Sequence, residues 1–243
     1  MRQVAEGSLS VGEAASRLRI LRTGDFSFAH VDTDRLRRCG LPEVIFCTGK
    51  TADQVSQIMA TIRKAGQDVL ATRASKELYE KILPDHPDAR YHDAARAITV
   101  DVVSPRSPEG LVVVVSAGTS DLPVAEEACL AVQRMGVRVE RAYDVGVAGI
   151  HRLEPYMNLL RTAHAVVVVA GMEGALPSVI GGLIDRPIVA VPTSIGYGLH
   201  LRGLTALLSM LNTCVPGISV VNVDNGFGGG VTAAIISRVA VAG

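Results

Sequence analysis

The sequence predicts an α/β protein: a C-terminal doubly wound, mostly parallel five-stranded sheet with helices on both faces, plus a smaller N-terminal α/β domain. Five short runs rich in valine and isoleucine alternate with helix-like patterns after residue 110, as expected for strands buried on both faces. Hydrophobic residues make up 48% of the 243 residues, and with four Phe and no Trp the core must be largely aliphatic. This composition favours helices packed on a parallel sheet.

The N-terminal part begins with a short predicted helix over residues 11–21. Ser10 fits an N-cap, and Glu13 follows three residues later, which is the spacing of a capping box. The pattern then predicts strands at 43–47, 68–72 and 97–103 and helices at 51–65 and 75–83.

Gly49-Lys50-Thr51 matches only the end of a phosphate-binding P-loop. That motif needs a glycine five residues before Gly49, and the position is occupied by Val44. We therefore interpret Thr51 as the N-cap of the following helix rather than as part of a nucleotide site.

A turn-rich segment divides the chain. Residues 104–110 read Ser-Pro-Arg-Ser-Pro-Glu-Gly, and the two prolines and the glycine interrupt any regular element. We therefore predict an N-terminal α/β domain of uncertain role over residues 1–103, a linker over 104–110 and a C-terminal domain over 111–243.

The C-terminal domain is predicted to contain five strand–helix units. Strands are expected at 111–115, 137–142, 165–170, 187–191 and 218–221, and helices at 124–135, 153–162, 176–184, 199–211 and 231–241. Regular alternation of this kind is typical of a doubly wound sheet.

Four loops that follow these strands are rich in glycine, hydroxyl and charged side chains. They span residues 116–121, 144–152, 171–178 and 192–198. In an open parallel sheet, ligands bind outside the carboxyl ends of the strands, so these loops should open at one edge and form a ligand crevice. A fifth segment, residues 224–230, could either cradle a phosphate or permit close chain packing at a subunit interface.

Two loop side chains are candidates for proton transfer, and each has a structural alternative. His151 beside Arg152 could donate a proton while the arginine binds phosphate or carboxylate, or the pair could simply begin a helix. Glu173, between Gly171 and Gly174, could have its pKa raised by desolvation near the crevice, or could stabilise the N-terminus of the next helix.

The four cysteines, Cys39, Cys47, Cys129 and Cys214, show no Cys-x-x-Cys spacing, so neither a disulfide framework nor a zinc site is predicted. A lone cysteine in an apolar context is usually a small core residue. The residues around Cys214 therefore do not by themselves indicate a catalytic role for it.

Charge and targeting features exclude several classes of function. Lys plus Arg and Asp plus Glu number 24 each, so no global field favours nucleic acid or an anionic membrane. The first residues lack a signal-peptide pattern, and no stretch approaches ~20 uninterrupted apolar residues. We expect a soluble, cytoplasmic protein that binds neither nucleic acid nor membrane.

Several motifs resemble one family. They are Ser-Ala-Gly-Thr-Ser-Asp-Leu-Pro at 116–123, Asp-Val-Gly-Val-Ala-Gly-Ile-His-Arg at 144–152, Gly-Met-Glu-Gly-Ala-Leu-Pro-Ser at 171–178, and the stretch from Asn212 to Gly228, which contains Cys214. Together with residues 34–45 and 49–54, they resemble the LarB family, the pyridinium-3,5-biscarboxylic acid mononucleotide synthases of nickel-pincer nucleotide biosynthesis. The C-terminal half is also similar to the carboxyaminoimidazole ribonucleotide mutase family, which implies that residues 111–243 form a mutase-like catalytic domain.

The resemblance implies carboxylation of nicotinic acid adenine dinucleotide at pyridinium C5 by CO2 or bicarbonate, with cleavage of the phosphoanhydride to release AMP. It also implies that Cys214 is the nucleophile. A pyridinium ring is electrophilic, but addition of a thiolate converts it into a dihydropyridine whose C5 is nucleophilic. A base then removes the C5 proton. For this role the motif favours Glu173, with His151 as a second candidate.

The remaining site residues are expected to hold the substrate. They are Ser116, Gly118, Thr119, Ser120, Asp121, Asp144, Arg152, Gly171 and Gly174. Because phosphoanhydride hydrolysis commonly uses a divalent ion, Mg2+ is expected, but no metal-ligand spacing identifies its site. No tightly bound organic cofactor is expected. The resemblance further implies a homo-oligomer, with an octamer as one candidate.

Two alternatives remain open. A mutase that moves a carboxylate on an aminoimidazole ribonucleotide would need His151 as an acid but not Cys214. A nucleotide-binding or regulatory module would bind its ligand in the crevice without reaction.

Overall fold

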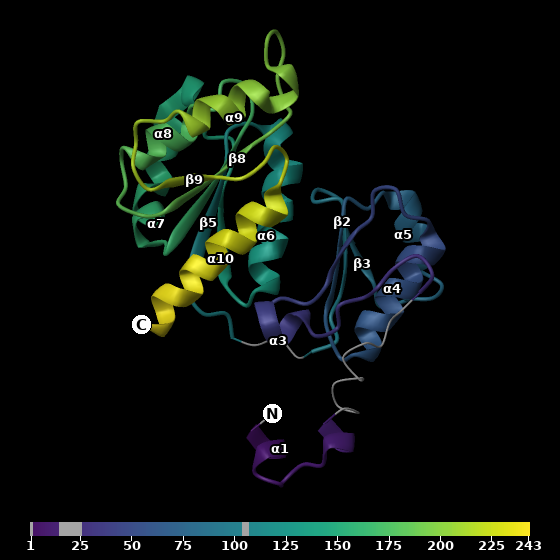
Figure 1. Ribbon diagram of the computed structural model, residues 1–243. Coiled ribbons are helices and arrows are strands. Elements are labelled where there is room, and N and C mark those ends of the chain that lie inside the picture. The colour runs from purple at the N-terminus through teal and green to yellow at the C-terminus, as the bar shows by residue number, and fades with distance from the viewer. Residues whose placement is uncertain (1, 15–25, 104–106) are drawn as a thin grey trace. The chain divides into compact units, whose positions relative to one another are not determined.

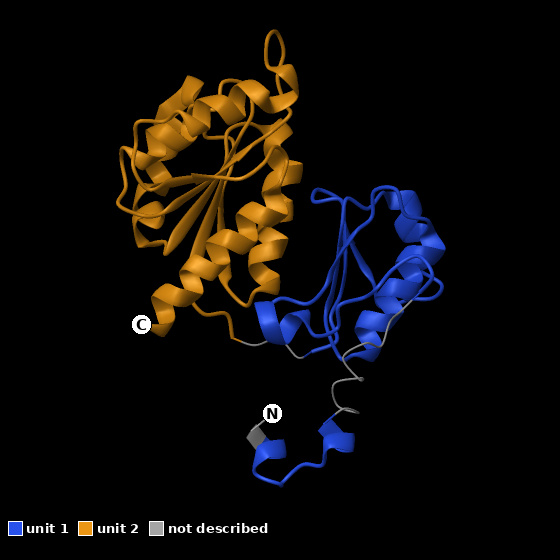
Figure 2. Cartoon of the chain, viewed as in Figure 1, with its two compact units in different colours: residues 1–104 blue, residues 105–243 orange. Residues whose placement is uncertain are grey.

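The chain divides into two compact units, residues 1–104 and 105–243 (Figure 2). The computed structural model describes residues 2–14, 26–103 and 107–243, so part of the predicted linker lies outside the described residues. Unit 1 contains a four-stranded sheet and unit 2 a five-stranded sheet. Across the described ranges, no helix combines the length and apolarity needed to cross a bilayer.

Unit 1 is a small mixed α/β fold. Its elements are α1 (Arg2–Ala5), α3 (Arg35–Cys39), β1 (Val44–Phe46), α4 (Ala52–Lys64), β2 (Val69–Thr72), α5 (Lys76–Ile82), β3 (Arg90–His92) and β4 (Ala97–Val100) (Figure 1). The strand order is β1-β2-β4-β3, in which β1 and β2 are parallel and β4 is antiparallel to both neighbours. The sequence pattern does not predict β3, because this edge strand is partly exposed and has no apolar run.

Two predicted helix starts in unit 1 are confirmed by their caps. Ser10 Oγ accepts a hydrogen bond from Glu13 N at 3.1 Å, and the Glu13 carboxylate accepts one from Ser10 N at 3.1 Å. Residues 11–14 are helical, while the rest of that predicted helix, 15–21, lies outside the described residues. Thr51 forms the same reciprocal box with Gln54 at the start of α4, which confirms Thr51 as an N-cap.

Unit 2 confirms the predicted five-stranded sheet. Its strands are β5 (Leu111–Ser116), β6 (Arg138–Ala142), β7 (Ala165–Ala170), β8 (Ile188–Pro192) and β9 (Ile218–Val220). They lie in the order β6-β5-β7-β8-β9, and every neighbouring pair is parallel. Every residue of β5, β7 and β8 is buried, which explains why these strands read as continuous valine-rich runs.

Helices cover both faces of this sheet. They are α6 (Leu122–Arg134), α7 (Met157–Thr162), α8 (Leu176–Gly181), α9 (Leu204–Leu211) and α10 (Gly226–Ala242), together with the 3-10 helices η1 (Thr119–Asp121), η2 (Val147–Tyr156) and η3 (Leu201–Gly203). On one face, alternate strand valines share a core with Leu160 of α7, Leu176 of α8 and Met210 of α9. On the other face, α6 and α10 lie side by side, and α10 also contacts β7 and β8 (Figure 1).

The glycines at the start of α10 pack closely against β8 and α6 within unit 2. A Cβ atom on Gly229 would lie 2.5 Å from Val191 Cγ2, and one on Gly230 would lie 2.9 Å from Ala131 Cβ on α6. Asn225 caps the helix through its Oδ1 atom, which accepts a hydrogen bond from Gly228 N at 2.7 Å. The predicted start of this helix at residue 231 is therefore wrong, because the cap and the packing begin it at Gly226.

Two other predicted helices begin later than expected. The predicted helix at 153–162 is α-helical only from Met157, because the chain before it winds as the 3-10 helix η2, which contains Pro155. The predicted helix at 199–211 starts only at Leu204, because Arg202 has a φ of 52° and breaks the helical path.

Replacing Gly230 with alanine should destabilise unit 2 by about 1–3 kcal/mol, because the new methyl group would force α10 away from α6 and outweigh the gain in helix propensity. Urea unfolding followed by circular dichroism measures the loss. Gly182→Ala is the matched control, since a Cβ there meets its nearest atoms at 3.6 Å and φ is −75°. Equal stability of the two variants would contradict this account of α10 packing.

Candidate functional site

The strand order places the predicted loops at one edge of the sheet. The chain leaves β5 for the edge strand β6 and then returns to β7 on the other side of β5. In doubly wound sheets, ligands bind where the strand order reverses in this way, outside the carboxyl ends of the two central strands. Here that position lies between the loops that follow β5 and β7, at residues 117–121 and 171–175.

Asp121 joins three of these loops. Its side chain is buried, and Oδ2 accepts a hydrogen bond from Gly118 N at 2.9 Å within the β5 loop. Oδ1 accepts a hydrogen bond from Thr193 Oγ1 at 2.7 Å in the loop after β8, and the backbone N–H of Gly171 after β7 also bonds to the carboxylate. Both oxygens are therefore engaged within the protein.

The electrostatic environment of Asp121 opposes its charge. Burial raises the pKa of Asp121, and the nearby Asp224 carboxylate raises it further, while the hydrogen bonds from Thr193, Gly118 and Gly171 act in the opposite direction. Sequence reasoning did not single out Thr193, although a hydroxyl directly after a buried strand was a usable signal. The structure places Asp121 and Thr193 in the buried framework of the loops.

The loop after β7 is tightly packed at both of its glycines. Met172 N donates a hydrogen bond to Ile195 O at 2.9 Å, and a Cβ atom on Gly171 would lie 2.6 Å from Thr193 Oγ1. Gly174 has a φ of 67°, and a Cβ there would lie 2.8 Å from Ala206 O. Glu173 lies exposed between these two glycines. The described residues of one chain therefore do not shield its carboxylate from solvent, although the sequence predicted such shielding.

Arg152 is oriented by a partner from the same loop. Asp144 Oδ2 lies 2.7 Å from Arg152 Nη1, and both side chains are partly exposed. Ser116 is fully buried at the end of β5, where its Oγ accepts a hydrogen bond from Asp144 N at 3.3 Å. The end of β5 thus positions Asp144, and Asp144 in turn holds the guanidinium at the rim of the sheet.

The side chains available to a ligand at this edge are the exposed ones. Among the predicted site residues, these are Thr119, Ser120, Asp144, His151 and Glu173, and Arg152 is half-exposed. Two hydroxyls, an imidazole, two carboxylates and a guanidinium can bind phosphate or sugar oxygens and can transfer protons.

Two further loops complete the edge. Ser194 N donates a hydrogen bond to Asp224 Oδ1 at 2.8 Å, and Asp224 N donates one to Pro192 O at 2.8 Å. These bonds join the loop after β8 to the loop after β9. Asp224 therefore has a structural role that the sequence pattern did not reveal.

Cys214 lies in a loop that leads into a strand, whereas the other predicted site loops follow strands. It lies between α9 and β9, four residues before β9 begins, so it precedes a strand instead of following one. The neighbouring Thr213 Oγ1 lies 2.8 Å from Ser178 Oγ on α8, the helix that begins three residues after Glu173. Through α8, the Cys214 segment and the Glu173 loop are connected.

The cysteines differ in accessibility. Cys214 and Cys39 are exposed, whereas Cys47 and Cys129 are buried. Burial raises the pKa of Cys47 to about 12 and that of Cys129 to about 11. A thiolate is thus strongly disfavoured at the two buried positions.

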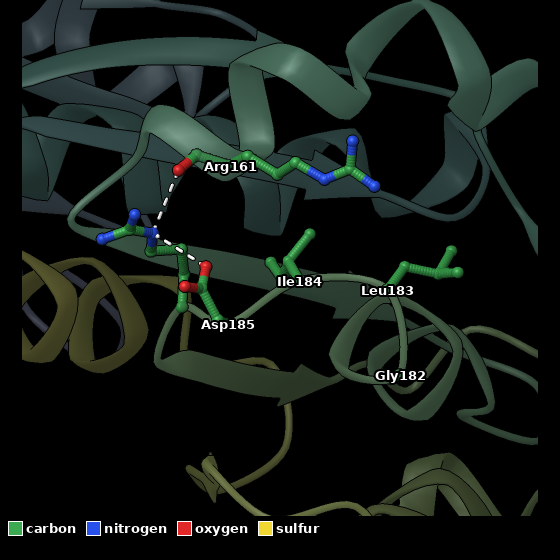
Figure 3. A pocket seen from close by; sticks show the side chains of 6 residues that line it. Arg161, Gly182, Leu183, Ile184 and Asp185 are labelled. Atoms are coloured by element: carbon green, nitrogen blue, oxygen red, sulfur yellow. Dashed lines mark hydrogen bonds and ion pairs between the residues drawn. The ribbon is translucent and has the colours of Figure 1, made fainter.

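A surface hollow of about 540 Å3 lies elsewhere in unit 2. It is lined by Arg161, Gly182, Leu183, Ile184, Asp185 and Arg186 (Figure 3). Arg186 Nε donates a hydrogen bond to Arg161 O at 3.0 Å and pairs with Asp185 Oδ1 at 3.2 Å. Because Gly182–Arg186 precede β8 and Arg161 precedes β7, the hollow lies at the amino ends of the strands and not at their carboxyl ends.

The described residues do not provide a preformed metal site. No group of three or more His, Cys, Asp or Glu side chains within the described ranges is arranged to hold a metal ion. The expectation of Mg2+ stays a prediction without an assigned site.

Comparisons with known proteins identify both halves of the chain. Residues 23–102 match the LarB/PurE-like N-terminal domain, and residues 111–242 match AIR carboxylase. An uncharacterized protein of Methanocaldococcus jannaschii is 41% identical over 219 residues, covering 86% of this chain and 84% of the relative. These matches confirm the resemblance inferred from the motifs.

Two relatives carry a named activity. The N5-carboxyaminoimidazole ribonucleotide mutase of M. jannaschii is 32% identical over 121 residues, covering 48% of this chain and 71% of the mutase. A probable mutase of the same kind from Methanothermobacter thermautotrophicus is 29% identical over 132 residues, covering 53% of this chain and 37% of that relative.

Replacing Asp121 with asparagine should lower the free energy of unfolding by about 1–3 kcal/mol, because an amide NH2 cannot accept the hydrogen bonds now made to the carboxylate. Urea unfolding measures the effect. Asp144→Asn is the matched control, since it removes only a solvent-exposed ion pair and should cost less than about 1 kcal/mol. If both variants lose the same stability, Asp121 does not organise the loops.

Iodoacetamide should modify Cys214 and Cys39 at least about tenfold faster than Cys47 and Cys129 in the folded protein. Burial restricts reagent access to the slow pair, and their raised pKa values lower the thiolate fraction by a factor of ten per unit. Peptide mapping by mass spectrometry after timed quenching gives all four rates. Labelling of Cys214 as slow as that of Cys129 would show that the thiol is not accessible.

Proposed function

The chain belongs to the AIR carboxylase family and carries a LarB/PurE-like N-terminal domain, and from this premise we propose the reaction that it catalyses. The proposed enzyme carboxylates C5 of the pyridinium ring of nicotinic acid adenine dinucleotide and hydrolyses the phosphoanhydride. The products are pyridinium-3,5-biscarboxylic acid mononucleotide and AMP.

The observation that carries this proposal is the exposed Cys214 in a chain that combines the two family domains. An AIR carboxylase domain alone supports a PurE-like carboxylase or mutase function. The LarB/PurE-like N-terminal domain favours the pyridinium substrate, and that substrate needs a nucleophile to activate it. Cys214 combines nucleophilic chemistry with accessibility.

In the proposed first half-reaction, the Cys214 thiolate adds to the pyridinium ring and forms a C–S bond. The ring becomes a neutral dihydropyridine whose C5 is enamine-like. C5 then attacks CO2 and forms the new C–C bond, while the ring regains its positive charge as an iminium. This sequence makes an electrophilic ring nucleophilic without an external reductant.

In the second half, a base removes the proton from C5, and the electron pair of that C–H bond re-forms the ring π-bond. Cleavage of the C–S bond then restores aromaticity and releases the thiolate. We assign the base to Glu173, whose loop leads directly into α8, beside the Cys214 segment. His151 is the second candidate because it is exposed at the same edge as Glu173.

Substrate binding is assigned to the loops at the carboxyl edge. Arg152, held by Asp144, supplies a charged donor for phosphate, and Thr119 and Ser120 supply exposed hydroxyls. The loops that carry these side chains are shaped by Ser116, Gly118, Asp121, Gly171 and Gly174.

The hydrolysis is a separate step. Water attacks phosphorus of the phosphoanhydride, and the P–O bond to the AMP portion breaks. A Mg2+ ion would neutralise the phosphates, and we expect it to require the substrate for binding.

The alternative is a carboxylate mutase acting on an aminoimidazole ribonucleotide. Two mutase relatives favour this activity, which would use His151 and leave Cys214 idle. A nucleotide-binding module without reaction is the remaining alternative, and the same substrates separate all three.

With nicotinic acid adenine dinucleotide, bicarbonate and Mg2+, the full chain should release AMP and the dicarboxylated mononucleotide, and Cys214→Ser should lower both rates at least about a hundredfold. Liquid chromatography with mass spectrometry quantifies both products. Cys39→Ser, which removes the other exposed thiol, should retain the wild-type rate.

Equal product formation by the wild-type chain and Cys214→Ser would rule out the cysteine mechanism. Conversion of a carboxyaminoimidazole ribonucleotide by both proteins, lost in His151→Asn, would instead establish the mutase. Saturable binding of the dinucleotide without turnover of either substrate would establish the binding module.

A further inference from the structure

Three cationic residues come together at one edge of the sheet in unit 1. Lys50 lies in the loop from β1 to α4, Arg73 directly follows β2, and Arg96 directly precedes β4. Because β1 and β2 are parallel and β4 is antiparallel to β2, all three positions lie at the same end of the sheet. We refer to Lys50, Arg73 and Arg96 as the basic edge of unit 1.

Backbone hydrogen bonds hold the three segments of the basic edge side by side. Cys47 N donates to Thr72 O at 3.0 Å, which joins the loop after β1 to the end of β2. Ala74 N donates to Arg96 O at 2.7 Å, which joins the turn after β2 to the turn before β4. The backbone positions of the three cationic residues are therefore fixed relative to one another.

The charged groups of Lys50 and Arg96 also stay at this edge. Lys50 Nζ donates a hydrogen bond to Phe46 O at 2.8 Å, at the end of β1, and its two other N–H groups can serve a ligand. Burial raises the pKa of Tyr91 and the charge of Arg96 acts in the opposite direction, so the guanidinium lies near the Tyr91 hydroxyl. That hydroxyl donates a hydrogen bond to Ala74 O at 3.2 Å, beside the end of β2.

Backbone strain is concentrated at the same edge. Arg73 has a φ of 55° and Arg96 one of 48°, and no other described residue of unit 1 except glycine has a positive φ. This conformation is costly for a residue with a Cβ atom, and glycine would avoid the cost. In unit 2, Asp144, Met172 and Asp224 adopt it in loops that follow strands. Two arginines at strained turns indicate that their side chains are needed there.

The local charge differs from that of the whole chain. In residues 47–51, 73–75 and 93–96, three bases accompany a single acid, Asp93, whereas the full sequence has 24 of each sign. The carboxylate of the nearby Glu77 is engaged at the start of α5, where a hydrogen bond from Ser75 lowers its pKa. The excess of positive charge is therefore confined to the edge.

We infer that the basic edge binds a small phosphate anion, a pyrophosphate group that is either free or esterified to a nucleoside. The lysine supplies a compact charge, and each guanidinium can pair with two phosphate oxygens. Thr48 N and Gly49 N, which donate to none of the described residues, add backbone donors beside Lys50. Thr51 keeps its structural task as the N-cap of α4, so this is not a P-loop.

Nucleic acid fits the basic edge less well than a small anion. Proteins that bind DNA commonly contact about six or more phosphates, and this edge has three cations. The inference gives unit 1 a binding role and requires no assumption about the reaction proposed for unit 2.

Isothermal titration calorimetry of the full chain with inorganic pyrophosphate tests the inference. The wild-type protein should bind it saturably, and Lys50→Gln and Arg96→Gln should each weaken binding at least about tenfold, because each removes a charged hydrogen-bond donor. Lys64→Gln is the matched control, since it removes the same charge at the other end of α4 and should retain the wild-type affinity.

Arg96→Gly separates binding from folding. Glycine adopts a φ of 48° without strain, so this variant should remain folded by circular dichroism and still bind pyrophosphate at least about tenfold more weakly. Competition by nicotinic acid adenine dinucleotide or AMP would support an esterified ligand, and binding of inorganic pyrophosphate without such competition would support a free one.

Absence of saturable binding up to about 1 mM pyrophosphate would overturn the inference. Wild-type affinity in the double variant Lys50→Gln/Arg96→Gln would also overturn it. If Arg152→Gln then abolished that binding, the anion would belong to the edge of unit 2 instead.

Discussion

One buried carboxylate organises the carboxyl edge of unit 2. Asp121 accepts hydrogen bonds from three loops that are far apart in the sequence, one of them 72 residues away at Thr193. Burial makes the charged form costly, and the hydrogen bonds partly compensate. Asp121 therefore holds the loops after β5, β7 and β8 together. The positions of the exposed side chains on these loops depend on it.

The residues at this edge fall into two layers. The inner layer, with Ser116, Asp121 and Thr193, is buried and satisfies its own hydrogen bonds. The outer layer carries the exposed hydroxyls, the imidazole and the carboxylates of Asp144 and Glu173 that a ligand can reach. Residues of one motif can therefore belong to different layers. In the 116–121 loop, Thr119 and Ser120 face solvent while Asp121 holds the framework.

The five strands could be predicted because each is a short apolar run between turn residues, and the doubly wound topology follows from their alternation with helices. The start of α9 could not be predicted, because it depends on the positive φ of Arg202, which leaves no mark on the hydrophobic pattern. Pro155 was a usable signal for the late start of α7. The motifs assigned substrate binding to Asp121 and Thr119 alike and did not separate the buried residue from the exposed one. The pairing of Asp121 with Thr193 and the link from Thr213 to Ser178 arise only when distant segments meet.

Helix α10 has a consequence for how the protein is made. It covers β7 and β8 and packs on α6, yet it follows every strand in the chain. During synthesis from the N-terminus, the valine-rich strands leave the ribosome before the helix that shields one of their faces. Until α10 emerges, the nascent sheet exposes apolar surface of the kind that chaperones recognise. Completion of this core therefore waits for the translation of α10.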